Sequence, residues 1–206
     1  MIIIDAMFPV ALAEATHFKG PTVVMSHTAV FRTLERWRQM IAMLVDLRTE
    51  AGFDPLPADL DTLWMTRDRV LVTTLDSLDD TPGAIANVGR FRYVGPCLEI
   101  EPHAERIALP WRTDDPTPLV LVSFSTAPEQ GSPAKFQSII EALAELPVRG
   151  VVTVGDSVDP ALLQPAANVL VVATADHNDL MRRAALVVSH GGHGTLMRAL
   201  RHGLPM

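Results

Sequence analysis

The 206-residue sequence has little cysteine, little basic charge and no long apolar run, and each shortage excludes a class of protein. Its one cysteine, Cys97, cannot form a disulfide within the chain, so nothing indicates an oxidising compartment. The formal net charge is −7, whereas proteins that bind the phosphate backbone of nucleic acids are usually basic. We therefore expect no nucleic-acid partner.

Signals for membranes and secretion are also missing. No apolar run approaches the roughly 20 residues that a membrane-spanning helix needs. The first residues lack a basic segment, and Asp5 interrupts their apolar run, which argues against a secretory signal. Hydrophobic residues make up 48% of the chain, enough for a sizeable core. These features predict a cytoplasmic protein without stable membrane insertion.

Short apolar runs alternate with segments of helical periodicity, which is typical of an α/β fold. Because β-α-β segments form parallel strand pairs with a helical crossover, we expect parallel sheets. Helical spacing is clearest in Phe8–Phe18, Phe31–Leu47 and Pro133–Leu146. The runs that predict strands are Ile2–Ile4, Thr22–Met25, Arg69–Thr73, Phe91–Val94, Leu119–Phe124, Val151–Val154, Val169–Val172 and Ala185–Val188.

The rhythm breaks once, near the middle of the chain. From Pro96 to Pro118 the sequence has five prolines, mixed charges and no periodicity. Such a composition predicts a linker that runs over the surface. We therefore expect one domain over residues 1–96, an interdomain linker over 97–118 and a second domain over 119–206.

The stretch from His190 to Thr195, with the sequence HGGHGT, lies between the last predicted strand and an amphipathic helix that Gly203 should end. Such a strand-turn-helix can place backbone N–H groups and a positive helix dipole against a phosphate. The turn has neither the lysine of a P-loop nor the G-x-G-x-x-G spacing. Its glycines alone would equally suit a structural turn. Its two histidines, at the carboxyl end of a strand, favour a diphosphate site.

Metal binding is the alternative for these histidines. His190 and His193 are three residues apart, and His177 and His202 are close in sequence. No carboxylate or cysteine lies nearby to complete a tetrahedral ligand set. We therefore expect no metal at this turn.

These residues resemble a known family. The strand-HGGHGT-helix stretch and the following His202–Met206 segment resemble the donor-binding signature of the family 1 glycosyltransferases. The resemblance is greatest to the bacterial, UDP-glycosyltransferase-like members that act on macrolides and other natural products. Ile2–Thr28 resembles the middle of the family's acceptor domain, Tyr93–Pro96 its exit, and Leu119–Thr126 the first strand and turn of the donor domain.

The resemblance implies two Rossmann-like domains that face each other across a cleft, the GT-B type, both incomplete in this chain. Residues 1–96 would be the carboxyl-terminal half of the acceptor-binding domain, and residues 119–206 the amino-terminal half of the nucleotide-sugar-binding domain. The chain would then be an internal fragment of a longer enzyme, and we expect it to be inactive alone.

The family also implies roles for residues of the donor half. His190 would bind the donor diphosphate, together with a segment and a turn that hold the phosphates. His177 would lie near the nucleobase, although Asp176 replaces the family's proline. Arg198 stands where plant members place a glutamate for the ribose. The phosphate-holding residues are Gly192, His193, Gly194, Thr195, Ser125 and Thr126.

Asp5 and His27 are the candidates in the acceptor half. From its position alone, Asp5 would be a helix cap. The resemblance implies instead that Asp5 orients a general-base histidine, to which no position in this chain corresponds. His27 ends the second predicted strand and is expected to line the acceptor cleft.

The activity implied by the resemblance is transfer of a sugar from a UDP- or dTDP-sugar to a hydroxyl of a small lipophilic acceptor, with inversion. It implies no metal and no cofactor besides the nucleotide-sugar co-substrate. Two alternatives remain: a truncated, non-catalytic nucleotide-binding protein, and a sugar-nucleotide epimerase of the same architecture. The resemblance of Ile2–Thr28 to an acceptor domain disfavours the epimerase.

Overall fold

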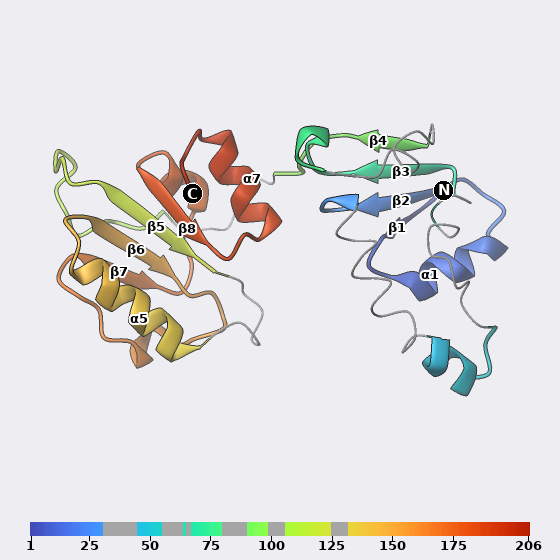
Figure 1. Ribbon diagram of the computed structural model, residues 1–206, viewed down its shortest axis with the longest axis horizontal. Helices are drawn as coiled ribbons and strands as arrows, with labels where there is room; N and C mark the ends of the chain where they lie inside the picture. The colour runs from blue at the N-terminus through green and yellow to red at the C-terminus, as the bar shows by residue number, and fades with distance from the viewer. Residues whose placement is uncertain (31–44, 55–63, 65–66, 80–89, 99–105, 125–131) are drawn as a thin grey trace. The chain divides into compact units, whose positions relative to one another are not determined.

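The computed structural model describes residues 1–30, 45–54, 64, 67–79, 90–98, 106–124 and 132–206. The chain divides into two compact units, Met1–Cys97 and Leu98–Met206, each built on a parallel sheet (Figure 1). The predicted α/β class is therefore confirmed. The predicted helix Phe31–Leu47 lies mostly outside the described residues, which show only its continuation over residues 45–50.

The first unit holds a four-stranded sheet in the order β1-β2-β3-β4, with every neighbouring pair parallel. Helix α1 (Pro9–Glu14) and the 3-10 turn η1 (Ala15–His17) make the crossover from β1 to β2, as the β-α-β pattern predicted. A further 3-10 turn, η2, covers Asp76–Leu78. The strands are β1 (Ile2–Asp5), β2 (Thr22–Ser26), β3 (Arg69–Val72) and β4 (Phe91–Tyr93).

One buried row crosses this sheet. Ile4 pairs with Val24, Val24 with Val70, and Val70 with Phe91, so four strands contribute one side chain each to the same face. Leu12 from α1 packs against this row. Because parallel strands are covered by their crossover helices, the β-branched runs of the sequence end in the core.

The second unit has the strand order β7-β6-β5-β8, again wholly parallel. The order reverses between β5 and β8, which is the topology of a doubly wound half-sheet. The strands are β5 (Leu119–Ser123), β6 (Arg149–Thr153), β7 (Val169–Val172) and β8 (Leu186–Ser189). The helices are α5 (Pro133–Ala144), the 3-10 turn η4 (Pro160–Leu162), α6 (His177–Met181) and α7 (His193–Arg201).

Alternate residues of β5 belong to two different cores. Val120 and Val122 pack with α5, through Phe136 and its neighbours. Leu119 and Leu121 pack with α6 and α7 instead. Because successive side chains of a strand point to opposite faces, this central strand is apolar from Leu119 to Val122 and buried on both sides.

One end each of α5 and α6 was not predicted from the sequence. Helix α5 ends at Ala144 rather than Leu146, because a residue before a proline, here Pro147, is disfavoured in helical conformation. Helix α6 begins at His177, because the Asp176 carboxylate caps it by accepting the Asp179 N–H at 3.0 Å.

Gly203 ends α7 as predicted. Its φ of +66° permits the left-handed turn, in which the Leu204 N–H donates to the Ala199 carbonyl at 3.0 Å and the Gly203 N–H to that of Leu200. This pair of bonds defines a Schellman motif.

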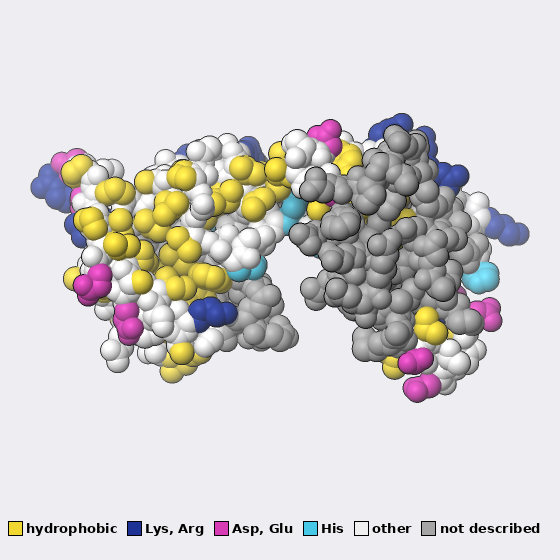
Figure 2. Space-filling view, viewed as in Figure 1, with side chains coloured by type: hydrophobic (Ala, Val, Ile, Leu, Met, Phe, Trp, Pro, Cys, Tyr) yellow, Lys and Arg dark blue, Asp and Glu magenta, His cyan; other side chains and the backbone are white. Residues whose placement is uncertain are grey.

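In the second unit, Leu200 and Met206 leave large apolar side chains exposed, and apolar groups are spread over the face shown in Figure 2.

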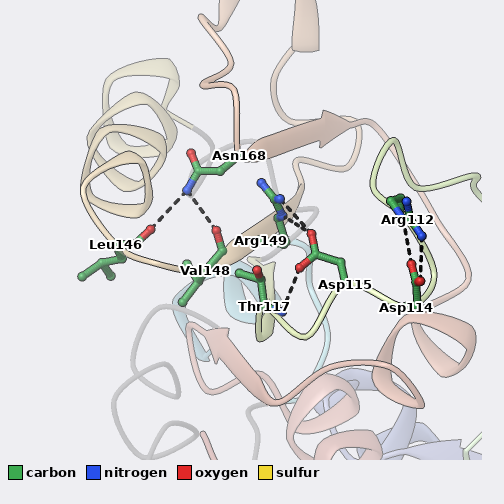
Figure 3. Close-up of polar contacts among 8 residues, drawn as sticks. All are labelled: Arg112, Asp114, Asp115, Thr117, Leu146, Val148, Arg149 and Asn168. Atoms are coloured by element: carbon green, nitrogen blue, oxygen red, sulfur yellow. Dashed lines mark hydrogen bonds and ion pairs between the residues drawn. The ribbon is translucent and has the colours of Figure 1, made fainter.

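The segment expected to be a surface linker contributes to the second unit. Ile107, Leu109 and Trp111 pack against the core beneath α6 and α7. The Asp115 carboxylate accepts hydrogen bonds from the Arg149 guanidinium at 2.8 and 3.1 Å and from the Thr117 N–H at 2.9 Å (Figure 3). These contacts tie the segment to the first residue of β6.

The same contacts affect the ionisation of Asp115. Hydrogen bonds from Thr117, followed by those from Arg149, lower the pKa of Asp115 to about 2. The carboxylate therefore remains charged at any pH above the acid range. A cavity of about 540 Å³ adjoins it, lined by residues that include Trp111, Arg112 and Arg183.

Candidate functional site

The strand order places the candidate site of the second unit between β5 and β8. Ligands of doubly wound sheets bind outside the carboxyl ends of the strands, at the point where the strand order reverses. Ser123, the last residue of β5, is in register with Ser189, the last residue of β8. Phe124 and His190 follow these two residues, so the sheet brings both to the same edge.

Glycine is required at positions 191 and 192, in the turn after β8, for two different reasons. Gly191 has a φ of +81°, a conformation that side-chain-bearing residues rarely adopt, and its N–H donates to Ser189 Oγ at 3.1 Å. Gly192 has φ −61° and ψ 134°, which any residue can adopt, and it is the N-cap of α7. The requirement for glycine at position 192 therefore comes from its surroundings and not from its backbone.

The amino end of α7 suits an anion. Its N-cap, Gly192, supplies no side-chain hydrogen bond, and the first turn has no acidic residue. The amides at the start of a helix have no carbonyl partner within the helix, and the helix dipole is positive there. Phosphates bind at such ends. His193, Gly194 and Thr195, all predicted phosphate-holding residues, form this first turn.

His190 is exposed in the turn, and two neighbours limit where its ring can lie. Its imidazole stacks on Phe124, with ring centroids 6.3 Å apart and planes inclined by 28°. At Gly192 a Cβ atom would lie only 2.5 Å from the Nε2 atom of His190. The sequence predicted a role for His190 but did not indicate its contact with Phe124.

His177 is positioned by a threonine that sequence reasoning missed. Thr153 ends β6, and its Oγ1 lies 3.1 Å from His177 Nε2 and 3.3 Å from the Val122 carbonyl. When the hydroxyl donates its one proton to that carbonyl, it accepts from the protonated Nε2 of His177. The signal available in the sequence was a polar residue at the carboxyl end of a buried strand.

The remaining predicted residues of this half are placed as follows. Ser125 and Thr126 lie outside the described residues. Arg198 is half-buried, and its Nη1 atom would lie 3.5 Å from a Cβ at Gly194. Among the described residues, no group of three or more His, Cys, Asp or Glu side chains could hold a metal ion.

The first unit brings Asp5 and His27 together. They lie at the carboxyl ends of β1 and β2, and Oδ2 of Asp5 is 3.4 Å from Nδ1 of His27. Oδ1 accepts the N–H of Met7 at 2.8 Å. Asp5 is not the cap of α1, whose N-cap is Phe8 without a side-chain hydrogen bond.

Exposed apolar side chains follow the carboxyl ends of three strands in this unit. They are between 40% and 63% exposed, although they are large hydrophobic residues: Phe8 after β1, Leu75 and Leu78 after β3, and Val94 after β4. The described residues of this edge therefore combine an imidazole-carboxylate pair with apolar surface.

Comparisons with known proteins agree with this geometry. Residues 155–206, which include the whole turn, match the family model described as Glycosyltransferase family 28 C-terminal domain. A demethyllactenocin mycarosyltransferase of Streptomyces fradiae is 34% identical over 118 residues, which are 57% of this chain and 25% of that protein. UDP-glycosyltransferase 2 of Phaeomoniella chlamydospora is 32% identical over 168 residues, covering 75% and 36%.

Solved structures show the same fold. The calicheamicin glycosyltransferase CalG4 superposes with a TM-score of 0.69 at 24% identity, covering 98% of this chain and 54% of that one. The chain is thus an α/β protein of GT-B type, and its sequence is similar to those of family 1-like glycosyltransferases. It spans between a quarter and about a third of the length of the two curated relatives.

Among the described residues, no helix is both long and apolar enough to cross a lipid bilayer.

Proposed function

We propose that this chain carries the diphosphate-binding part of the donor site of a nucleotide-sugar-dependent glycosyltransferase, together with part of its acceptor-binding unit. One observation carries the proposal: His190 and the amino end of α7, whose first turn has no acidic residue, lie together at the point where the strand order reverses. This is where an open α/β sheet binds phosphate groups. The names of the relatives, which are sugar transferases, support it.

In the proposed reaction, an acceptor hydroxyl oxygen attacks the anomeric carbon from the face opposite the diphosphate. The bond from that carbon to the phosphate oxygen breaks, so the configuration inverts and a nucleoside diphosphate leaves. Its negative charge is met by His190, Thr195 and the first amides of α7, which are donors fixed before the reaction. Because these groups compensate the charge, the proposed step uses no metal and no cofactor.

The proton of the acceptor hydroxyl goes to a general base. We assign Asp5 the role of orienting a histidine that acts as this base and that lies outside the 206 residues. His27, which contacts Asp5, is assigned to the acceptor surface. The exposed apolar residues at the same edge favour a small lipophilic acceptor.

In the donor half, Ser125 and Thr126 are assigned to the phosphates and His177 to the surroundings of the nucleobase. The contact between His177 and Thr153 supports the latter assignment, because it fixes the imidazole at the carboxyl end of β6. UDP- and dTDP-sugars are the donors to test.

The experiment uses the gene-encoded protein, that is, the complete product of the gene that contains this sequence. It is incubated with a UDP- or dTDP-sugar and a macrolide aglycone, and mass spectrometry measures the glycosylated product. His190→Ala should lower kcat/KM at least about tenfold, because a hydrogen bond to a charged group contributes roughly 1.5–3 kcal/mol. Leu162→Ala, a change at an exposed residue of η4, is the control and should leave turnover unchanged. Equal turnover by the His190→Ala and wild-type proteins would contradict the proposal.

A further inference from the structure

The imidazole of His190 lies on an exposed turn, yet one ring contact and one steric limit restrict where its ring can lie. Charge on a departing diphosphate is stabilised best by donors that are already in position, since they need no reorganisation. An exposed histidine without neighbours would have to be ordered each time a ligand binds. The residues that touch this ring are therefore of functional interest themselves.

Phe124 provides the first contact, from a rigid base. It directly follows β5, and its ring meets the ring of Phe136 edge-on, with centroids 5.8 Å apart and planes at 89°. Phe136 lies in α5, is 1% exposed and belongs to the core of the second unit. The imidazole of His190 stacks on Phe124 in turn, at a centroid distance within the usual range for ring pairs. Two successive ring contacts, Phe136 with Phe124 and Phe124 with His190, thus connect the core to the site.

Gly192 limits the position of the ring in another way, because its missing side chain leaves the space that the imidazole occupies. Its φ of −61° needs no glycine, unlike the φ of +81° at Gly191. A Cβ atom at position 192 would lie 2.5 Å from Nε2 and 2.7 Å from Cε1 of His190, so the ring would have to move. At Gly194, by contrast, a Cβ would meet only the Arg198 side chain at 3.5 Å, an ordinary contact.

We propose that Phe124 and Gly192 are positioning residues that hold the imidazole of His190 where it meets the diphosphate of a nucleotide. The inference rests on the proposed function, because it takes His190 to be a diphosphate ligand. It adds that the aromatic ring at position 124 and the missing side chain at position 192 act through His190 and not through the stability of the fold.

The test measures UDP affinity by titration calorimetry and the carbon-bound imidazole protons of His190 by NMR, in the gene-encoded protein. Phe124→Leu and Gly192→Ala should weaken UDP binding about two- to tenfold, the range expected for losing one ring contact or one pre-ordered side chain. Phe124→Tyr keeps the ring and should stay within about twofold of the wild type. Leu162→Ala is the surface control.

Two further readouts separate positioning from general packing. The His190 ring protons should shift in Phe124→Leu and return towards the wild-type position in Phe124→Tyr, because the stacked ring causes the shift. In the His190→Ala background, Phe124→Leu and Gly192→Ala should have no further effect on UDP binding, since residues that act through one another are not additive.

Three results would overturn the inference. If Phe124→Leu weakens UDP binding equally with and without His190, Phe124 acts through the fold. If His190→Ala weakens binding while Phe124→Leu and Gly192→Ala change neither affinity nor the ring protons, only the positioning roles are wrong. If His190→Ala leaves UDP binding unchanged, the proposed function is wrong and the positioning roles with it.

Discussion

Nδ1 of His27 lies 3.4 Å from Oδ2 of Asp5, at the carboxyl ends of two neighbouring strands. The other oxygen of Asp5 accepts the Met7 N–H, so the carboxylate is fixed at one end and faces an imidazole at the other. A carboxylate arranged in this way can orient a histidine.

The first prediction separates the roles of these two residues. Asp5→Asn should lower kcat/KM about 100-fold or more, because an unoriented general base loses most of its effect. His27→Gln should instead raise the KM for the acceptor and change kcat little. Asp46→Asn, at an exposed carboxylate of the same unit, is the control. A loss of kcat in His27→Gln as large as that in Asp5→Asn would make His27 itself the base.

The second prediction concerns the two kinds of glycine in the turn. Gly191→Ala should lower the free energy of unfolding by about 1–2 kcal/mol, because its φ of +81° is strained for any residue with a Cβ atom. Gly194→Ala, inside α7 with room for a methyl group, should raise it by up to about 1 kcal/mol. Chemical unfolding measures both, and a loss of stability in Gly194→Ala equal to that in Gly191→Ala would contradict the expectation.

The third prediction is a pH dependence at Asp115. Its folded-state pKa, about 2, lies below the ordinary carboxyl value, so its bonds stabilise the folded state above about pH 4. This stabilisation is lost as the pH falls from about 4 to about 2. Asp115→Asn should therefore lower Tm at neutral pH, and the difference from the wild type should vanish towards pH 2.

The control for Asp115 is an exposed pair next to it. Asp114 accepts two hydrogen bonds from Arg112 at 2.8 and 2.9 Å, but both side chains are largely exposed (Figure 3). Exposed ion pairs add little to stability. Asp114→Asn should change Tm little at any pH. A pH-independent Tm difference between Asp115→Asn and the wild type would rule out the proposed role of the Asp115 charge.

The fourth prediction concerns the hydroxyl of Thr153. Thr153→Val keeps the shape of the side chain but removes the bond to His177, and UDP should bind about two- to tenfold more weakly, as expected for one hydrogen bond. Thr153→Ser keeps the hydroxyl and should bind UDP nearly as the wild type does. Equal UDP affinity in the valine variant and the wild type would remove His177 from the nucleotide site.

The sequence predicted those parts of the fold that depend on local patterns. β-branched runs predicted the strands, because buried strands favour these residues. Gly203 predicted the end of α7, because the left-handed backbone there favours glycine. The start of α6 was not predicted, although Asp176 is an ordinary N-cap residue. Asp176 was interpreted only as a replacement for the family's proline and not as a helix cap.

The sequence predicted which residues form the candidate site, but it did not predict which side chains contact one another there. The HGGHGT turn shows its chemistry in sequence, whereas Phe124 and Thr153 are ordinary strand-end residues until the strand order places them beside His190 and His177. The pairings of Phe124 and Thr153 depend on which strands are neighbours, a long-range property that one sequence does not reveal. Asp5 and His27 differ, because the predicted β-α-β unit already places the ends of their two strands at one edge of the sheet.

The most direct test of the diphosphate site is an NMR titration of the gene-encoded protein with UDP, following its backbone amides. The largest shift changes should fall on residues 191–195, and His190→Ala should reduce them. Changes confined to other parts of the chain, for example around Arg112 and Arg149, or no changes at millimolar UDP, would contradict a diphosphate site at the start of α7.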